Sequence, residues 1–111
     1  MMKSSEIVII DDRLNEVVRR IVEETDPDKI ILFGSRVREE NGEDSDYDLF
    51  VLKRGARNAG ELEKRIYRRL FGTGLPVDII VEAAETYEEL KSNPFLIYKE
   101  ISRHGRVLYE K

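Results

Sequence analysis

Residues 30–35 read Ile30-Ile31-Leu32-Phe33-Gly34-Ser35, and residues 46–51 read Asp46-Tyr47-Asp48-Leu49-Phe50-Val51. Each segment contains a short continuous apolar run, which is typical of a buried β-strand. Gly34-Ser35 ends the first strand, whereas two aspartates stand at the entrance of the second. Only about a dozen residues join the two strands.

Helical and strand patterns lie on both sides of these strands. Upstream, apolar residues at helical spacing predict a helix that ends at Asp26-Pro27-Asp28, since proline disfavours the helical conformation of the residue before it. Downstream, the pattern predicts a helix over 61–71 and a third buried strand over 77–81. The apolar stripe of the first helix comprises Leu14, Val17, Val18, Ile21 and Val22.

The C-terminal part carries weaker signals. Thr86 and Glu89 have the spacing of a capping box, which predicts a short helix there. Asn93-Pro94 resembles an N-cap followed by proline in the first helical position, and Gly105 is expected to end that helix. An edge strand is predicted over residues 106–109. The expected fold is α/β or α+β, with a small mixed sheet flanked by helices.

Composition narrows the class of protein. The 111 residues suit a single domain over 1–111. The absence of cysteine excludes disulfides, thiolate zinc sites and cysteine catalysis. A net charge of −4 and a pI of about 5.1 argue against bulk electrostatic binding to nucleic acid. Apolar runs are too short for a membrane span or a signal peptide, so we expect a cytoplasmic protein.

Two carboxylates at the entrance of the second strand form a candidate metal site. Residues 39–48 are rich in acidic side chains, most of which read as a solvated loop. Asp46 and Asp48 differ because residues two apart in a strand point to the same face. Two converging carboxylates repel each other unless a cation lies between them, and Mg²⁺ prefers such oxygen ligands.

Asp78 is a third candidate, because it interrupts the apolar run 77–81. An unpaired carboxylate inside a core strand is costly, so Asp78 lies at a strand edge, pairs with an arginine or has a chemical role. Three carboxylates from two neighbouring strands can hold two metal ions about 3.5–4 Å apart, an arrangement that stabilises phosphoryl transfer.

The turn after the first strand is a candidate phosphate site. Gly34 permits close approach of a phosphate, the hydroxyl of Ser35 can donate to it, and Arg36 adds positive charge. If a short helix opens here, its N-terminus also favours anions.

These features together resemble the signature of the nucleotidyltransferase superfamily with the DNA polymerase β-like fold. Gly34-Ser35 is followed by ten residues, then by Asp46-Tyr47-Asp48, and later by Asp78, in the family's order. In particular, the chain resembles the minimal nucleotidyltransferases (MNT), small prokaryotic proteins of about this length. The ending Gly105-Arg106-Val107-Leu108-Tyr109-Glu110 is also similar to theirs.

The resemblance implies a role for each candidate. Asp46 and Asp48 would ligate Mg²⁺ and bridge two ions, and Asp78 would complete the second metal site and help to activate the attacking hydroxyl. Gly34 and Ser35, with Arg36 beside them, would hold the phosphates of ATP. The family often has a small residue in place of Val37 and glycine in place of Glu39, which affects the loop between these groups but removes no ligand.

The resemblance also implies a reaction and a partner. Members transfer AMP to a tyrosine of a HEPN-domain toxin and thereby act as antitoxins, so we expect a HEPN partner and a homo- or hetero-oligomer. Three other interpretations remain open: an antitoxin that masks its partner without catalysis, a transferase for small molecules, and a plain acidic metal-binding domain.

Other polar residues have simpler expected roles. A basic run on the predicted central helix reads as a solvated face, with docking of an acidic partner or contact with RNA as the alternatives. His104 suits the C-terminal end of a helix, and Tyr47 is expected to pack in the core. The basic run comprises Lys64, Arg65, Arg68 and Arg69.

Overall fold

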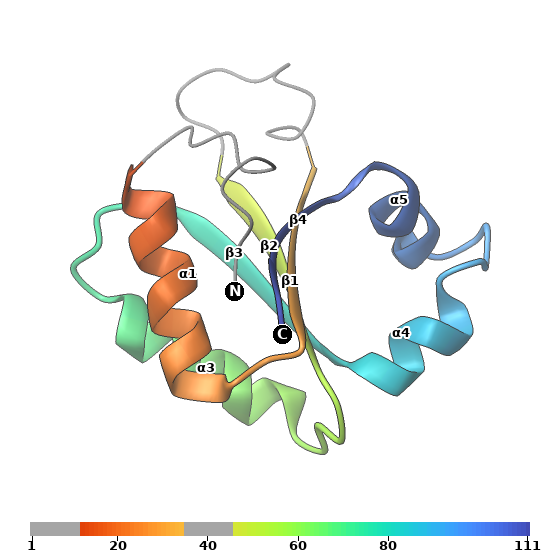
Figure 1. Ribbon diagram of the computed structural model, residues 1–111, viewed down its shortest axis with the longest axis horizontal. Helices are drawn as coiled ribbons and strands as arrows, with labels where there is room; N and C mark the ends of the chain where they lie inside the picture. Colours follow the sequence, from red (N-terminus) through yellow and green to blue (C-terminus); the bar gives the residue numbers. More distant parts are fainter. Residues whose placement is uncertain (1–11, 35–45) are drawn as a thin grey trace.

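The computed structural model describes residues 12–34 and 46–111, which form a four-stranded sheet with two helices on each face (Figure 1). None of the described helices is long and apolar enough to cross a membrane. The elements follow in the order α1 (Asp12–Thr25), β1 (Lys29–Phe33), β2 (Tyr47–Lys53), α3 (Ala59–Leu70), β3 (Val77–Ala83), α4 (Ala84–Leu90), α5 (Ile97–His104) and β4 (Arg106–Glu110).

The sheet is mixed, as the sequence predicts. Its strand order is β3-β2-β1-β4, with β1 antiparallel to both of its neighbours and β2 parallel to β3. Helix α3 makes the crossover between the two parallel strands, and such a connection requires a dozen or more residues. As a result, β1 ends where β2 and β3 begin, so the ends of three strands meet at one end of the sheet.

Both faces of the sheet are covered because its strands alternate between two sets of apolar residues. Leu49 and Val51 point to the face covered by α1 and α3. Phe50 and Leu52 point to the face covered by α4 and α5. In Figure 1 these two helix pairs lie on opposite sides of the sheet. Tyr47 is buried on the first face, so its predicted role in core packing is confirmed.

Strand β3 lies at an edge of the sheet, and the predicted burial holds for Ile79 and Val81 on one face, whereas Asp78 and Ile80 on the other face are exposed. Side chains of α3 cover the outer edge of this strand. The hydroxyl of Tyr67 accepts a hydrogen bond from the amide of Ile79 at 2.8 Å, and Glu63 accepts one from the amide of Val81 at 3.0 Å. These bonds satisfy amides that an open edge would offer to another chain.

Two predicted helix starts are wrong. Helix α4 follows β3 without a loop, so its N-cap is Ala83 and Thr86 lies inside the helix. Asn93 does not cap a helix at Pro94. Its side chain accepts a hydrogen bond from the amide of Phe95 at 2.9 Å and closes a turn, and α5 begins only at Ile97. Asparagine often makes this local bond, which competes with helix initiation.

The predicted basic run lies at the exposed surface of α3, where two of its arginines bind carboxylates of α1. Arg65 donates to Glu24 at 2.9 Å, and Arg69 forms an ion pair with Glu23. These pairs join the two helices at their solvent side. The structure therefore favours a solvated helix face over a docking surface for this run.

Candidate active site

Three aspartates and a glycine meet at the end of the sheet where β1 ends and β2 and β3 begin. Gly34 directly follows β1, and Asp46 directly precedes β2. Asp48 is the second residue of β2 and pairs in register with Phe33 of β1. Asp78 is the second residue of β3. The resemblance to the nucleotidyltransferase signature predicts that these residues share one site, and the strand topology places them at the same end of the sheet.

Asp48 and Asp78 lie directly opposite each other in the parallel pairing of β2 and β3. Neighbouring strands are about 4.8 Å apart, and paired residues point to the same face. Phe50 lies two residues after Asp48 and packs under α4 and α5, so both carboxylates belong to that face. Asp78 is exposed and Asp48 is partly buried. They therefore form an adjacent pair at the uncovered end of this face.

Asp48 lies close enough to the other two aspartates to be affected by their charges. Burial raises the pKa of the Asp48 carboxyl, and the negative charges of Asp78 and Asp46 raise it further. Within residues 12–34 and 46–111, no lysine or arginine is among the causes that shift this pKa. The ionised site consequently has an unfavourable concentration of negative charge, which a bound cation would relieve.

Gly34 brings the backbone of the predicted phosphate turn against Asp48. Its φ of +83° is favourable for glycine and strained for other residues. A Cβ atom at this position would lie 2.3 Å from Oδ2 of Asp48 and 3.2 Å from its Cγ. Both the backbone conformation and the contact with Asp48 therefore favour glycine here. The turn and the carboxylate form one compact unit.

The predicted phosphate ligands Ser35 and Arg36 lie outside the described residues, as do Val37 and Glu39. Their roles stay predictions. Of the predicted phosphate-binding group, the structure describes Gly34.

The donor set fits a hard divalent cation, although the described side chains are not assembled around one. In the two described segments, no three Asp, Glu, His or Cys side chains have an arrangement that could hold a metal ion. Carboxylates that repel one another are not expected to converge without a cation. Mg²⁺ prefers oxygen ligands such as carboxylates. The assignment of Asp46, Asp48 and Asp78 as its ligands stays a prediction.

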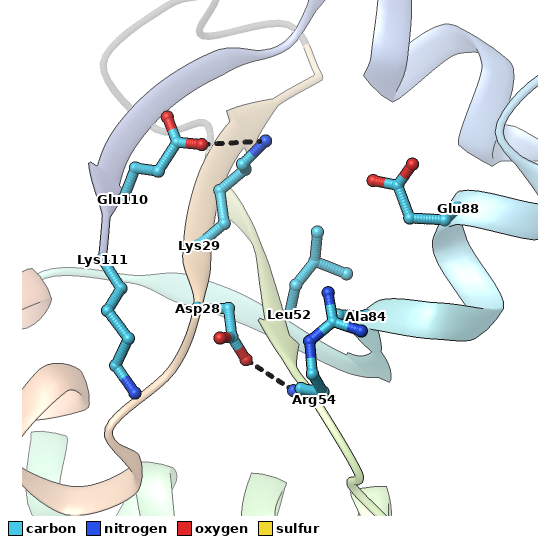
Figure 2. A pocket seen from close by; sticks show the side chains of 8 residues that line it. All are labelled: Asp28, Lys29, Leu52, Arg54, Ala84, Glu88, Glu110 and Lys111. Atoms are coloured by element: carbon cyan, nitrogen blue, oxygen red, sulfur yellow. Dashed lines mark hydrogen bonds and ion pairs between the residues drawn. The ribbon is translucent and has the colours of Figure 1, made fainter.

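A pocket of about 260 Å³ lies at the opposite end of the sheet, next to α4 (Figure 2). Lys29 lines it and begins β1, whereas Gly34 follows the end of β1, about 16 Å away at the usual rise of a strand. Several of its charged groups bind other parts of the fold. Lys29 forms an ion pair with Glu110 at 3.5 Å, and Asp28 accepts a bond from the Arg54 amide at 2.6 Å. This pocket is separate from Asp46, Asp48 and Asp78.

Sequence reasoning missed two features on the same face as Asp48 and Asp78. Ile80 is a large apolar residue that stays 37% exposed beside the aspartates. Tyr98 of α5 donates a hydrogen bond to Glu82 of β3, and burial followed by this bond raises the pKa of Tyr98 to about 12. The alternation of Asp78, Ile80 and Glu82 with Ile79 and Val81 was the signal in the sequence, since it marks one face of β3 as more polar.

Comparison with known proteins supports the functional interpretation. The pattern of the nucleotidyltransferase domain family matches residues 12–108, which is most of the chain. The chain belongs to the nucleotidyltransferase domain family. Nucleotidyltransferase domains generally use nucleoside triphosphates and divalent metals, which agrees with the chemistry of the three aspartates.

Solved structures agree with this nucleotidyltransferase fold. Four chains match, and one is the crystal structure of a presumed nucleotidyltransferase from Sulfolobus solfataricus. That protein is 22% identical over 70% of each chain, with a TM-score of 0.56, so the likeness shows the fold. A search of curated proteins gave no match. The predicted superfamily and fold are confirmed, whereas the MNT subfamily stays a prediction.

Proposed function

We propose that this nucleotidyltransferase transfers AMP from ATP to the hydroxyl of a tyrosine in a HEPN-domain partner, in a Mg²⁺-dependent reaction. In this proposal it acts as the antitoxin of that partner. Family membership supports nucleotidyl transfer. The resemblance of Gly34-Ser35 and Asp46-Tyr47-Asp48 to the MNT signature supports the acceptor and the partner. The proposed reaction uses ATP, so a cytoplasmic location is part of the proposal.

The register of Asp48 with Asp78 is the observation that carries the proposal. It brings two carboxylates side by side from strands far apart in the sequence, and Asp46 adds a third charge. Among the described residues, these carboxylates raise the pKa of Asp48 and thus oppose its ionisation, which adds nothing to the stability of the fold. A carboxyl group whose pKa is raised by burial and by neighbouring carboxylates, as that of Asp48 is, is typical of functional sites.

Asp46, Asp48 and Asp78 would hold the divalent ions, which when bound neutralise phosphate charge and assist in-line attack on the α-phosphorus with release of pyrophosphate. Gly34 brings the backbone at the end of β1 into contact with Asp48, so a phosphate bound by this turn would lie next to the proposed metal ligands. Asp78 is exposed and therefore accessible to an acceptor hydroxyl. In this role Asp78 accepts the proton of that hydroxyl or orients it.

The covered sheet supports the need for a partner. Helices α1 and α3 are used to cover one face, and α4 and α5 cover most of the other. The acceptor hydroxyl must be held about 3–3.5 Å from the phosphorus for efficient attack. A second protein is the natural source of the surface that holds it.

The test combines nucleotide binding with transfer of a label. ATP is titrated into the chain with Mg²⁺ and then with EDTA, and α-labelled ATP is added with the product of the neighbouring helical reading frame. We expect metal-dependent binding and label on a tyrosine of that product. The label should vanish in Asp78→Ala and persist in Glu89→Gln, which removes an exposed charge from α4.

Each alternative has its own outcome in this test. Neutralisation of the partner without label would show a masking antitoxin. Rapid multiple turnover on a small molecule by the chain alone would show a small-molecule transferase. Equal ATP affinity with Mg²⁺ and with EDTA would exclude the metal site and with it the proposed reaction.

A further inference from the structure

We propose that Ile80 determines acceptor specificity, by packing against the carbon skeleton that carries the attacked hydroxyl. This inference rests on the proposed function, because it assigns Asp78 to the acceptor side of the site. It selects a hydroxyl attached to a flat apolar group, as in the phenol of tyrosine, over the hydroxyls of a sugar.

The position of Ile80 is fixed by the register of the sheet. It lies two residues after Asp78 on β3 and therefore points to the same face. It pairs directly with Phe50 of β2, just as Asp78 pairs with Asp48. The face thus has a row of carboxylates followed by an apolar row. A group whose hydroxyl reaches Asp78 has Ile80 as its next neighbour along β3.

The exposure of Ile80 separates it from the other apolar residues near it. Phe50 is fully buried, and Ile31 and Phe33 are also buried on this face. Ile80 stays 37% exposed. The cover provided by α4 and α5 therefore ends before it reaches this side chain, and leaves an apolar surface open beside the aspartates.

Helix α5 keeps this surface in place. The ring centroid of Tyr98 lies 5.6 Å from that of Phe50, and its hydroxyl donates to Glu82, two residues beyond Ile80. The start of α5 is thereby tied to both β2 and β3 next to Ile80. The apolar surface at Ile80 is bounded by Asp78 on one side and by this bond on the other.

The chemistry of that surface distinguishes between acceptors. A phenol ring gains free energy when it covers Ile80, since apolar area leaves water on both sides. A sugar placed there would lose water from its hydroxyls, and the hydrocarbon side chain of Ile80 offers no hydrogen bond in return. The site therefore favours an aromatic hydroxyl.

The experiment measures acceptor binding separately from nucleotide binding. The full chain is loaded with Mg²⁺ and α,β-methylene-ATP, and N-acetyl-L-tyrosinamide or the sugar methyl α-D-glucopyranoside is titrated in and followed by NMR. We expect the tyrosine compound to bind more tightly. Ile80→Thr should weaken it about four- to fifteenfold, the range for loss of one or two buried CH₂ groups, with unchanged nucleotide affinity.

Val107→Thr is the matched control. Val107 is also β-branched, lies on the opposite edge strand β4 and is 42% exposed. It pairs with Ile31, so it points to the same face of the sheet as Ile80, but at the edge far from Asp78. The control variant should leave both affinities unchanged. Ile80→Val should retain most of the preference for the tyrosine compound.

The outcomes separate this inference from the proposed function. If nucleotide binds and Ile80→Thr leaves acceptor affinity unchanged, the role of Ile80 is refuted and the proposed function stands. If Ile80→Thr weakens the nucleotide instead, Ile80 contacts the base and the inference is wrong. If the wild-type chain binds no nucleotide with Mg²⁺, the proposed function is refuted, and the inference that rests on it falls too.

Discussion

Replacing Gly34 with alanine tests whether the turn after β1 and the carboxylate of Asp48 form one unit. The added Cβ would lie 2.3 Å from Oδ2 of Asp48, well inside contact distance. The backbone φ of +83° is strained for alanine as well. Gly34→Ala therefore combines two separate costs, and another glycine of the chain allows them to be measured apart.

Both costs can be given approximate sizes. Holding alanine at a positive φ costs roughly 1–2 kcal/mol. Turning the Asp48 side chain away from a favoured rotamer costs about 0.5–1.5 kcal/mol more. The free energy of unfolding should therefore fall by roughly 1.5–3.5 kcal/mol, which is a large part of the stability of a small domain.

Urea unfolding followed by circular dichroism measures this loss, and Gly72→Ala is the control. Gly72 has a similar φ of +89°, and no atom lies within 4 Å of the position that a Cβ would take, so its replacement should show the backbone cost alone, about 1–2 kcal/mol. In an Asp48→Ala background, Gly34→Ala should cost no more than Gly72→Ala. Equal losses for both glycine variants in the wild-type background would refute the close contact between Gly34 and Asp48.

Three further predictions concern the aspartates and the edge strand. In metal-free buffer, Asp48→Asn should raise the melting temperature at pH 7. The pKa of Asp48 is raised in the folded state, which means that the folded state binds the proton more tightly than the unfolded state does. Above the folded pKa, ionised Asp48 therefore destabilises the folded state. This advantage should vanish by about pH 3, where the carboxyl is protonated in both states, and an advantage that grew on acidification would contradict the sign. Asp78→Asn should leave the fold intact by circular dichroism and abolish label transfer from α-labelled ATP, whereas activity within a few-fold of wild type would exclude Asp78 from the site. Tyr67→Phe should speed hydrogen exchange of the Ile79 amide and lower the free energy of unfolding by about 0.5–1.5 kcal/mol. The Val81 amide bonds to a different side chain and should stay protected. Unchanged exchange at Ile79 would show that the bond to Tyr67 does not protect this amide.

The sequence patterns that predicted the starts of α4 and α5 were misleading, because the preceding strand or turn determines where each helix begins. Thr86 and Glu89 have capping-box spacing, but β3 leads directly into α4 and the helix begins before Thr86. Asn93 precedes proline as an N-cap would, yet its side chain closes a turn with Phe95. In both cases the local pattern is compatible with two structures, and the connection to the next element selects one of them.

The sequence by itself determined the strands, most of the helices and the group of aspartates. Continuous apolar runs and helical spacing depend on burial, which acts along each segment whatever its partners are. The order of Gly34, Asp46, Asp48 and Asp78 indicated nucleotidyl transfer because it resembles the signature of the nucleotidyltransferase superfamily.

Tertiary structure decided which neighbours these residues have. Only the pairing of β2 with β3 puts Asp48 opposite Asp78, and only the strand order makes β3 an edge strand where Asp78 and Ile80 stay exposed. The contact between Gly34 and Asp48 likewise joins residues from two strands. Such contacts depend on register and on where covering helices end, and these are set by the packing of the whole sheet.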